Sequence, residues 1–143
     1  MASSGVGELV FIDQIMDKTV YLNILKNNLK KSAEKLGLGR DFYFQSDHDP
    51  KHTAHIVRMW VAYNIAHTLP TPPQSPDLNP NEHLWAELEV RLRKYHITNK
   101  NQLKQLLLEE WNNIQPEFTS KLVHSMPKRI REIIKNKGLH TKY

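Results

Sequence analysis

Cysteine is absent from the 143-residue chain, and glycine occurs only five times. Without cysteine, neither a disulfide bond nor a thiolate metal site can form. So few glycines argue against phosphate-binding loops, and the sequence contains no P-loop, glycine-rich dinucleotide turn or nucleophile elbow. No apolar run approaches the roughly 20 residues that a membrane-spanning helix needs. We therefore expect no membrane partner and no small-molecule cofactor.

Positive charge exceeds negative charge, and the excess is concentrated near the C-terminus. The formal net charge is +5, and residues 121–143 include seven basic side chains against one acid, Glu132. Such a cationic end suits a polyanion, and a nucleic acid is the commonest example. A solvated basic helix face without a partner accounts for these charges about as well. The predicted DNA contacts are Lys128, Arg129, Arg131, Lys135 and Lys137.

The N-terminal half alternates between strand-like and helix-like patterns. Residues 9–12 form a short apolar run that predicts a buried strand. Asp17 is predicted to cap a helix that Gly37 ends, and residues 41–45 predict an aromatic strand with side chains on two alternating faces. A strand, a helix and a second strand predict a βαβ-like crossover in a mixed α/β sheet.

The rest of the chain predicts helices on either side of a proline-rich loop at 68–79. One helix is expected over 51–66, and Asn79 is expected to cap the next, with Pro80 in its first position. Amphipathic patterns then predict further helices in the C-terminal part of the chain. These last helices are expected over 99–114, 118–123 and 127–136. The whole chain, residues 1–143, is expected to form a single domain. The predicted inward-facing side chains include Ile56, Trp60, Tyr63, Trp85, Leu88, Leu92, Tyr95, Ile130, Ile133 and Ile134.

Two acidic residues occupy positions suited to metal binding. Asp47 directly follows the predicted aromatic strand, and ligands collect at the carboxyl ends of strands in open α/β sheets. Glu82 lies in the first turn of the helix that Asn79 caps, and 34 residues separate the two acids. Mg²⁺ prefers one or two carboxylates together with waters and substrate phosphates. Each acid also has a purely structural explanation, since Asp47 or Asp49 suits an Asx turn or cap and Glu82 suits a capping box.

Three histidines, His48, His52 and His55, cluster beside Asp47. Such a cluster can bind a zinc ion. However, the spacing is not that of a metalloprotease, and no cysteine supports the site. Histidines on the surface or at a helix cap are therefore the favoured interpretation.

Both acids belong to longer motifs, Asp47-His-Asp-Pro-Lys-His-Thr53 and Gln74-Ser-Pro-Asp-Leu-Asn-Pro-Asn-Glu-His-Leu-Trp85. At this spacing, the two motifs resemble the DDE catalytic core of the Tc/mariner superfamily of transposases, and of its Sleeping Beauty-like members in particular. The resemblance extends from the segment that begins at Gly5 to the ending Thr141-Lys-Tyr143. It therefore covers nearly the whole chain.

This resemblance implies an RNase H-like α/β fold of the integrase and transposase type. It also implies a triad of two aspartates and a glutamate that binds two Mg²⁺ ions, with Mn²⁺ as a substitute. Carried over, Asp47 and Glu82 are the second and third acids, both catalytic and metal-binding. No residue matches the first acid, because Asp13 lies on a segment that does not carry it in the family. We therefore expect an N-terminally truncated catalytic domain with a helical C-terminal half.

Two functions of different classes follow. The first is a transposase catalytic core for metal-dependent DNA strand cleavage and strand transfer, incomplete without the first aspartate. The alternative is an inactive, transposase-derived protein that holds DNA or another partner through its basic C-terminal helices, and a third hypothesis is an unstable fragment. The resemblance implies transposon ends and target DNA as partners and the nucleus as the location. It leaves a homodimer open.

Overall fold

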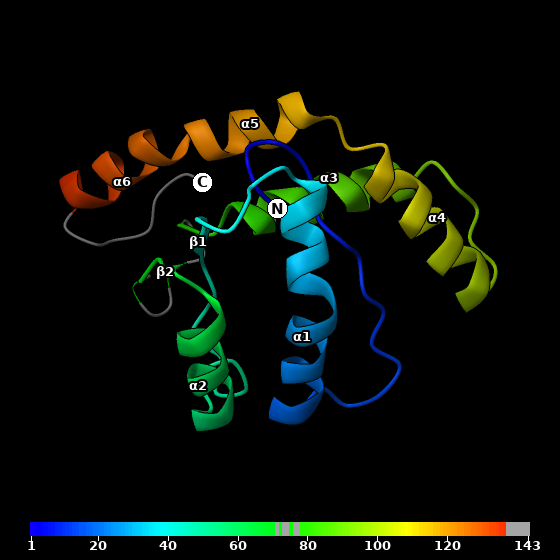
Figure 1. The fold of residues 1–143 in the computed structure, drawn as a ribbon. Coiled ribbons are helices and arrows are strands. Elements are labelled where there is room, and N and C mark those ends of the chain that lie inside the picture. The colour runs from blue at the N-terminus through cyan, green and yellow to red at the C-terminus, as the bar shows by residue number, and fades with distance from the viewer. Residues whose placement is uncertain (71, 73–74, 76–77, 137–143) are drawn as a thin grey trace. The chain divides into compact units, whose positions relative to one another are not determined.

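A computed structural model describes residues 1–70, 72, 75 and 78–136 of the chain (Figure 1). Backbone contacts divide the chain into two compact units. One is Val10–Gln74, and the other combines Met1–Leu9 with Ser75–Tyr143. No helix in the described part is long and apolar enough to span a membrane. The prediction of a single domain over residues 1–143 stays a prediction.

Helix α1 (Lys18–Lys35) begins and ends where the sequence predicts. The Asp17 carboxylate accepts the backbone N–H groups of Thr19 and Val20, each at 2.8 Å, which satisfies two free donors of the first turn. Gly37 adopts the left-handed conformation, with φ +65°, just beyond the helix end. The most buried side chains of α1 are Leu25 and Ala33.

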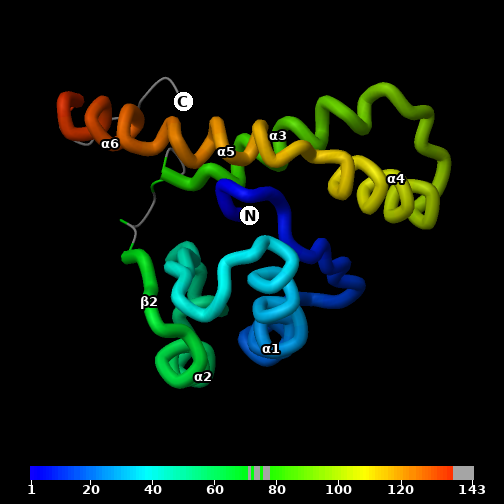
Figure 2. The backbone as a smooth tube through the Cα atoms, turned by 45° about the horizontal axis from the view of Figure 1, so that its top comes forward, coloured from blue at the N-terminus to red at the C-terminus, as the bar shows by residue number. Residues whose placement is uncertain are grey.

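A strand–helix–strand crossover follows α1. Strand β1 (Tyr43–Phe44) pairs in parallel with β2 (His67–Thr68), and α2 (His55–Asn64) connects them. A parallel pair requires such a crossover, but this one is not the predicted unit, which joined a strand over residues 9–12 to the strand at 41–45 through α1. The α/β class is the predicted one. Strand β2 was not predicted, because a two-residue strand is too short to show a periodic pattern in the sequence. Helices α1 and α2 lie side by side, as Figure 2 shows.

The prediction of a strand over residues 9–12 is wrong. This segment forms neither helix nor strand, and it has no ladder of backbone hydrogen bonds within the described part of the chain. An apolar run becomes a strand only when a neighbouring strand satisfies its N–H and C=O groups. The sequence pattern reports the apolar character of the run and not the presence of such a neighbour.

Helix α2 begins at His55, four residues later than predicted. A turn occupies the preceding residues, in which the Asp49 carbonyl accepts the N–H groups of His52 and Thr53 at 2.9 and 3.0 Å. The buried face of α2 also differs, because Val57 is buried while Ile56 and Tyr63 are exposed. The prediction that these two residues face inward is therefore wrong.

In its described part, the other unit contains four helices, α3 (Pro80–Leu92), α4 (Lys100–Asn112), α5 (Pro116–His124) and α6 (Met126–Lys135). Asn79 caps α3 with its side-chain oxygen, as predicted, and Asn99, which was predicted as the first residue of its helix, caps α4 in the same way. Helix α3 packs against α4 and α5, and α6 continues from α5 (Figure 1). The buried core consists of Val6, Leu84, Leu88, Trp111 and Ile114.

On α3 the prediction is confirmed at Leu88, which is buried, but it is wrong at both ends of the stripe. Leu84 is fully buried, whereas Trp85 is 46% exposed and Tyr95, beyond the helix end, is 41% exposed. The two aromatic residues were therefore wrongly predicted to face inward. Each still has a partner, since Trp85 stacks on Trp111 and the Tyr95 hydroxyl donates to Glu110 at 2.6 Å.

Helix α6 also presents a different face from the predicted one. Ile130 and Ile134 are exposed, while Arg129 is buried at 3% exposure. The Arg129 guanidinium donates through Nε to the Ser125 hydroxyl at 2.9 Å, so its charge has a polar contact inside the fold. A long basic side chain buries its aliphatic stem easily, which explains why charge alone gave the wrong face.

Candidate functional site

Asp47 lies three residues beyond the end of β1, at the carboxyl end of the parallel pair. Its side chain is 60% exposed. The Oδ1 atom accepts the backbone N–H of Asp49 at 3.1 Å, which is the Asx turn expected as the structural explanation. The same oxygen also contacts Nδ1 of His52, and this second contact is not part of an Asx turn.

His52 is held in place from several sides. Its side chain is only 16% exposed, and its ring packs on Tyr21 of α1 with the centroids 3.9 Å apart. Burial raises the pKa of Tyr21 to about 12, and the carboxylates of Asp47 and Asp49 add to this shift. The prediction of a surface or capping histidine is wrong for His52. The signal for the contact was its position five residues after an acid, across a turn.

Asp49 serves the turn itself. Its Oδ1 accepts the backbone N–H of Lys51 at 2.8 Å, and its Oδ2 lies 3.0 Å from the Lys51 ammonium group. The hydrogen bond from the Lys51 backbone, followed by that from its side chain, lowers the pKa of the Asp49 carboxyl group. With both oxygens engaged locally, Asp49 is less suited than Asp47 to bind a ligand.

Glu82 is the third residue of α3 and is exposed. Its Oε1 accepts the side-chain amide of Asn79 at 3.2 Å, while the Asn79 side-chain oxygen accepts the N–H of Asn81 at 3.1 Å. Glu82 therefore contacts the capping side chain and not the backbone N–H that a capping box uses. With this contact to Oε1 among the described residues, the exposed carboxylate is accessible to a cation.

Asp47 and Glu82 belong to different units of the chain, so the structure describes each in its own surroundings. Both provide the hard oxygen ligands that Mg²⁺ and Mn²⁺ accept, and both are exposed. Their chemistry therefore fits the implied metal. Within the described residues, no cluster of three or more histidine, aspartate or glutamate side chains is arranged to hold an ion.

The predicted DNA contacts divide into three groups. Lys128, Arg131 and Lys135 are exposed on α6, whereas Arg129 is buried in the fold. Lys137 lies outside the described residues. The exposed three provide positive charge for phosphate groups, while the position of Arg129 indicates a structural role.

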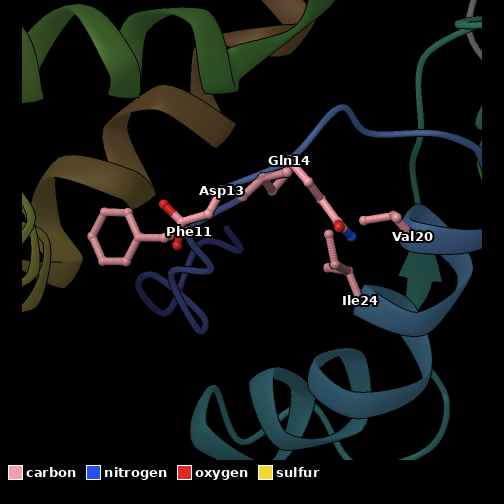
Figure 3. Close-up of a pocket in the computed structure, with 6 residues that line it drawn as sticks. Phe11, Asp13, Gln14, Val20 and Ile24 are labelled. Carbon is pink, nitrogen blue, oxygen red and sulfur yellow. The ribbon is translucent and has the colours of Figure 1, made fainter.

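A surface hollow lies elsewhere in the unit of residues 10–74. It is lined by residues 11–14 of the extended segment and by Val20 and Ile24 of α1. Figure 3 shows the Gln14 side chain directed toward these two α1 residues. Asp13 is the one carboxylate in its lining, so the hollow does not provide paired metal ligands.

Comparison with known proteins places these motifs in a family. The Tcb1 transposase of Caenorhabditis briggsae is 41% identical over 142 residues, which cover 99% of this chain and 52% of that protein. The Tc1 transposase of Caenorhabditis elegans is 42% identical over 141 residues, with 99% and 51% covered. The chain belongs to the Tc/mariner transposase family. It spans about half the length of these relatives, and no family model matches it.

Solved structures of this family have the same fold. The crystal structure of the Mos1 mariner transposase catalytic domain matches with a TM-score of 0.82 and 26% identity, covering 98% of this chain and 72% of that one. The Mos1 catalytic domain with Raltegravir and Mn matches with a TM-score of 0.84 and 25% identity, covering 98% and 74%. This Tc/mariner chain therefore has an RNase H-like fold, as the resemblance implied.

Proposed function

We propose that this Tc/mariner chain supplies two metal-binding acids, Asp47 and Glu82, to a transposase site that cleaves and joins DNA strands. The observation that carries the proposal is the setting of Asp47. It lies at the carboxyl end of a parallel strand pair, with an exposed carboxylate whose described contacts all involve Oδ1. Ligand sites in α/β proteins collect at this edge of the sheet.

In the proposed cleavage, a water oxygen forms a new bond to phosphorus while the bond to the 3′ oxygen breaks, leaving a 3′-hydroxyl. In strand transfer, the oxygen of that hydroxyl bonds to a phosphorus of the target DNA while the bond from this phosphorus to the 3′ oxygen of the target strand breaks, which leaves a 3′-hydroxyl on the target strand. Two divalent cations, when bound, stabilise the attacking and leaving oxygens of such displacements. Asp47 and Glu82 would hold these cations, and the basic residues of α6 would attract the DNA backbone.

Metal use has support from relatives. Mos1 catalytic domains have been solved with Mg and with Mn, and a Mos1 paired-end complex with Mg matches this chain with a TM-score of 0.87 at 26% identity. For this chain we propose Mg²⁺, with Mn²⁺ as a substitute. By the same likeness we propose transposon-end and target DNA as partners, a homodimer as the assembly and the nucleus as the location.

Nicking of supercoiled plasmid DNA tests the proposal. The assay uses this chain and the longest natural product that contains it, with Mg²⁺ or Mn²⁺. We expect metal-dependent nicking that is lost in Asp47→Asn and in Glu82→Gln. Asp41→Asn is the matched control, because Asp41 is another exposed aspartate that contacts a histidine, His67, at 2.7 Å. Nicking that survives both test substitutions would contradict the proposal.

A second function is favoured by the exposed basic side chains of α6. An inactive member of the family that binds DNA would use Lys128, Arg131 and Lys135 without any need for the two acids. Its signature is salt-sensitive DNA binding that is unchanged in Asp47→Asn and Glu82→Gln, without nicking by any natural product.

A further inference from the structure

We propose that His52 is a positioning residue, which fixes the Asp47 carboxylate so that its second oxygen, Oδ2, is presented to a divalent cation. The inference rests on the proposed function, because it takes Asp47 to be a metal ligand. It adds a residue that does not bind the metal itself but decides which oxygen does.

The contacts of the Asp47 carboxylate are one-sided. The Asp49 N–H and the His52 ring nitrogen Nδ1 both contact Oδ1, whereas Oδ2 has no contact described within its unit. An ionised carboxylate only accepts hydrogen bonds, so Nδ1 carries the proton and donates it. Two donors on one oxygen fix the plane of the group and leave the lone pairs of the other available.

The backbone and a neighbouring helix hold the donor in place. The turn after Asp49 sets the His52 backbone, whose N–H donates to the Asp49 carbonyl at 2.9 Å. Tyr21 of α1 then covers the ring, with the two ring centroids 3.9 Å apart and an interplanar angle of 30°. A ring restrained at both its backbone and its face has little freedom to leave Asp47.

The other ring nitrogen points to the same role. His52 Nε2 is buried and has no hydrogen-bond partner in the described part of the chain. Leaving a buried polar atom without a partner is unfavourable, so packing alone would favour an apolar ring here. The polar role of this residue therefore lies at Nδ1. An imidazole that orients a carboxylate for a metal reverses the usual order, in which the carboxylate orients a ligating histidine.

A second aspartate–histidine pair in the same unit provides the control. Asp41 and His67 are 2.7 Å apart, and the His67 ring stacks on Tyr43 with centroids 4.8 Å apart. This pair has the same composition but is exposed, with the His67 side chain 43% accessible against 16% for His52. Substitutions at His67 should therefore leave metal binding unchanged.

The test measures Mn²⁺ binding to the chain by the electron paramagnetic resonance signal of the free ion. His52→Phe keeps a ring against Tyr21 but has no donor, whereas His52→Asn keeps a donor near the position of Nδ1 without the ring. His52→Ala has neither the ring nor a donor. Because both His52→Asn and His52→Ala lack the ring, the difference between their Mn²⁺ affinities measures the effect of the donor alone. His67→Phe is the matched control, Asp47→Asn is the reference, and thermal melting checks the fold of each variant.

We expect His52→Phe and His52→Ala to weaken Mn²⁺ binding by about 10- to 100-fold, the usual effect of losing a group that orients a metal ligand. His52→Asn should restore most of the affinity. If Asp47→Asn weakens binding but no His52 variant does, the positioning role is wrong and the proposed function stands. If Asp47→Asn itself changes nothing, the metal assignment fails and this inference fails with it.

Discussion

The indole nitrogen of Trp111 donates a hydrogen bond of 2.8 Å to the backbone carbonyl of Gly7, 104 positions earlier in the chain. Trp111 is 5% exposed and packs in the core of its unit, with Leu84 and Leu88 of α3. This bond ties the N-terminal segment to α4. It satisfies a buried carbonyl group in a segment that forms no strand.

Substitution of Trp111 should therefore be costly. Trp111→Phe removes the hydrogen bond to the Gly7 carbonyl and reduces core volume, so we expect a loss of about 1–3 kcal/mol of unfolding free energy. Trp85→Phe is the matched control, because Trp85 stacks on Trp111 at 5.2 Å but is 46% exposed. Urea denaturation measures both variants. Equal losses would show that stacking, and not the bond to Gly7, is the important contact.

Two neighbouring arginines of α6 should separate folding from DNA binding. Arg129 is buried and donates to Ser125, so Arg129→Ala should lower the melting temperature through lost packing and a lost hydrogen bond. Arg131 is exposed, so Arg131→Ala should fold normally but bind DNA more weakly. The slope of the logarithm of the DNA-binding constant against the logarithm of the salt concentration should then decrease by about one, as expected for the loss of one phosphate contact. The opposite pattern would contradict the observed face of α6.

Tyr21 should make stability depend on pH in the alkaline range. Burial, with the nearby carboxylates of Asp47 and Asp49, raises its pKa from 10.0 to about 12. The folded chain therefore keeps the phenol proton over a range in which the unfolded chain loses it. The resulting stability is fully present below pH 10 and is lost as the pH rises through about 12.

Urea denaturation at increasing pH measures this effect. The unfolding free energy of the wild-type chain should fall more steeply above pH 10 than that of Tyr21→Phe, which has no phenol to titrate. Tyr43→Phe is the control, because Tyr43 is 68% exposed. The Tyr95 pKa is also raised, chiefly by its hydrogen bond to Glu110, but Tyr95 contributes equally to all three curves. Parallel curves for the wild type and Tyr21→Phe would contradict the prediction.

Capping residues in the sequence predicted the starts of α1 and α3. Asp17 and Asn79 each cap a helix that begins at the next residue, as predicted, because a cap depends on a few neighbouring backbone groups. The inward faces were harder to predict. Trp85 and Ile130 fit an apolar stripe, yet both are exposed, since the neighbour that a helix packs against is not encoded in its own period.

The same distinction applies to the candidate site. The motifs led to Asp47 and Glu82 and to the family, whereas the part played by His52 depends on a turn and on the approach of α1. The sequence shows His52 five residues after Asp47, but it cannot show that the ring turns back toward the acid and lies under Tyr21. Contacts between side chains of different elements could therefore not be predicted from the sequence.

We propose that Asp47 and Glu82 hold the same divalent cations, and a double-mutant cycle on Mn²⁺ binding tests this most directly. Isothermal titration is carried out on the wild-type chain, Asp47→Asn, Glu82→Gln and the double variant, with Asp41→Asn as control. We predict that each single substitution weakens the same binding event by at least about tenfold and that the two effects are not additive. Independent, additive losses, or no loss from either substitution, would contradict a shared metal site.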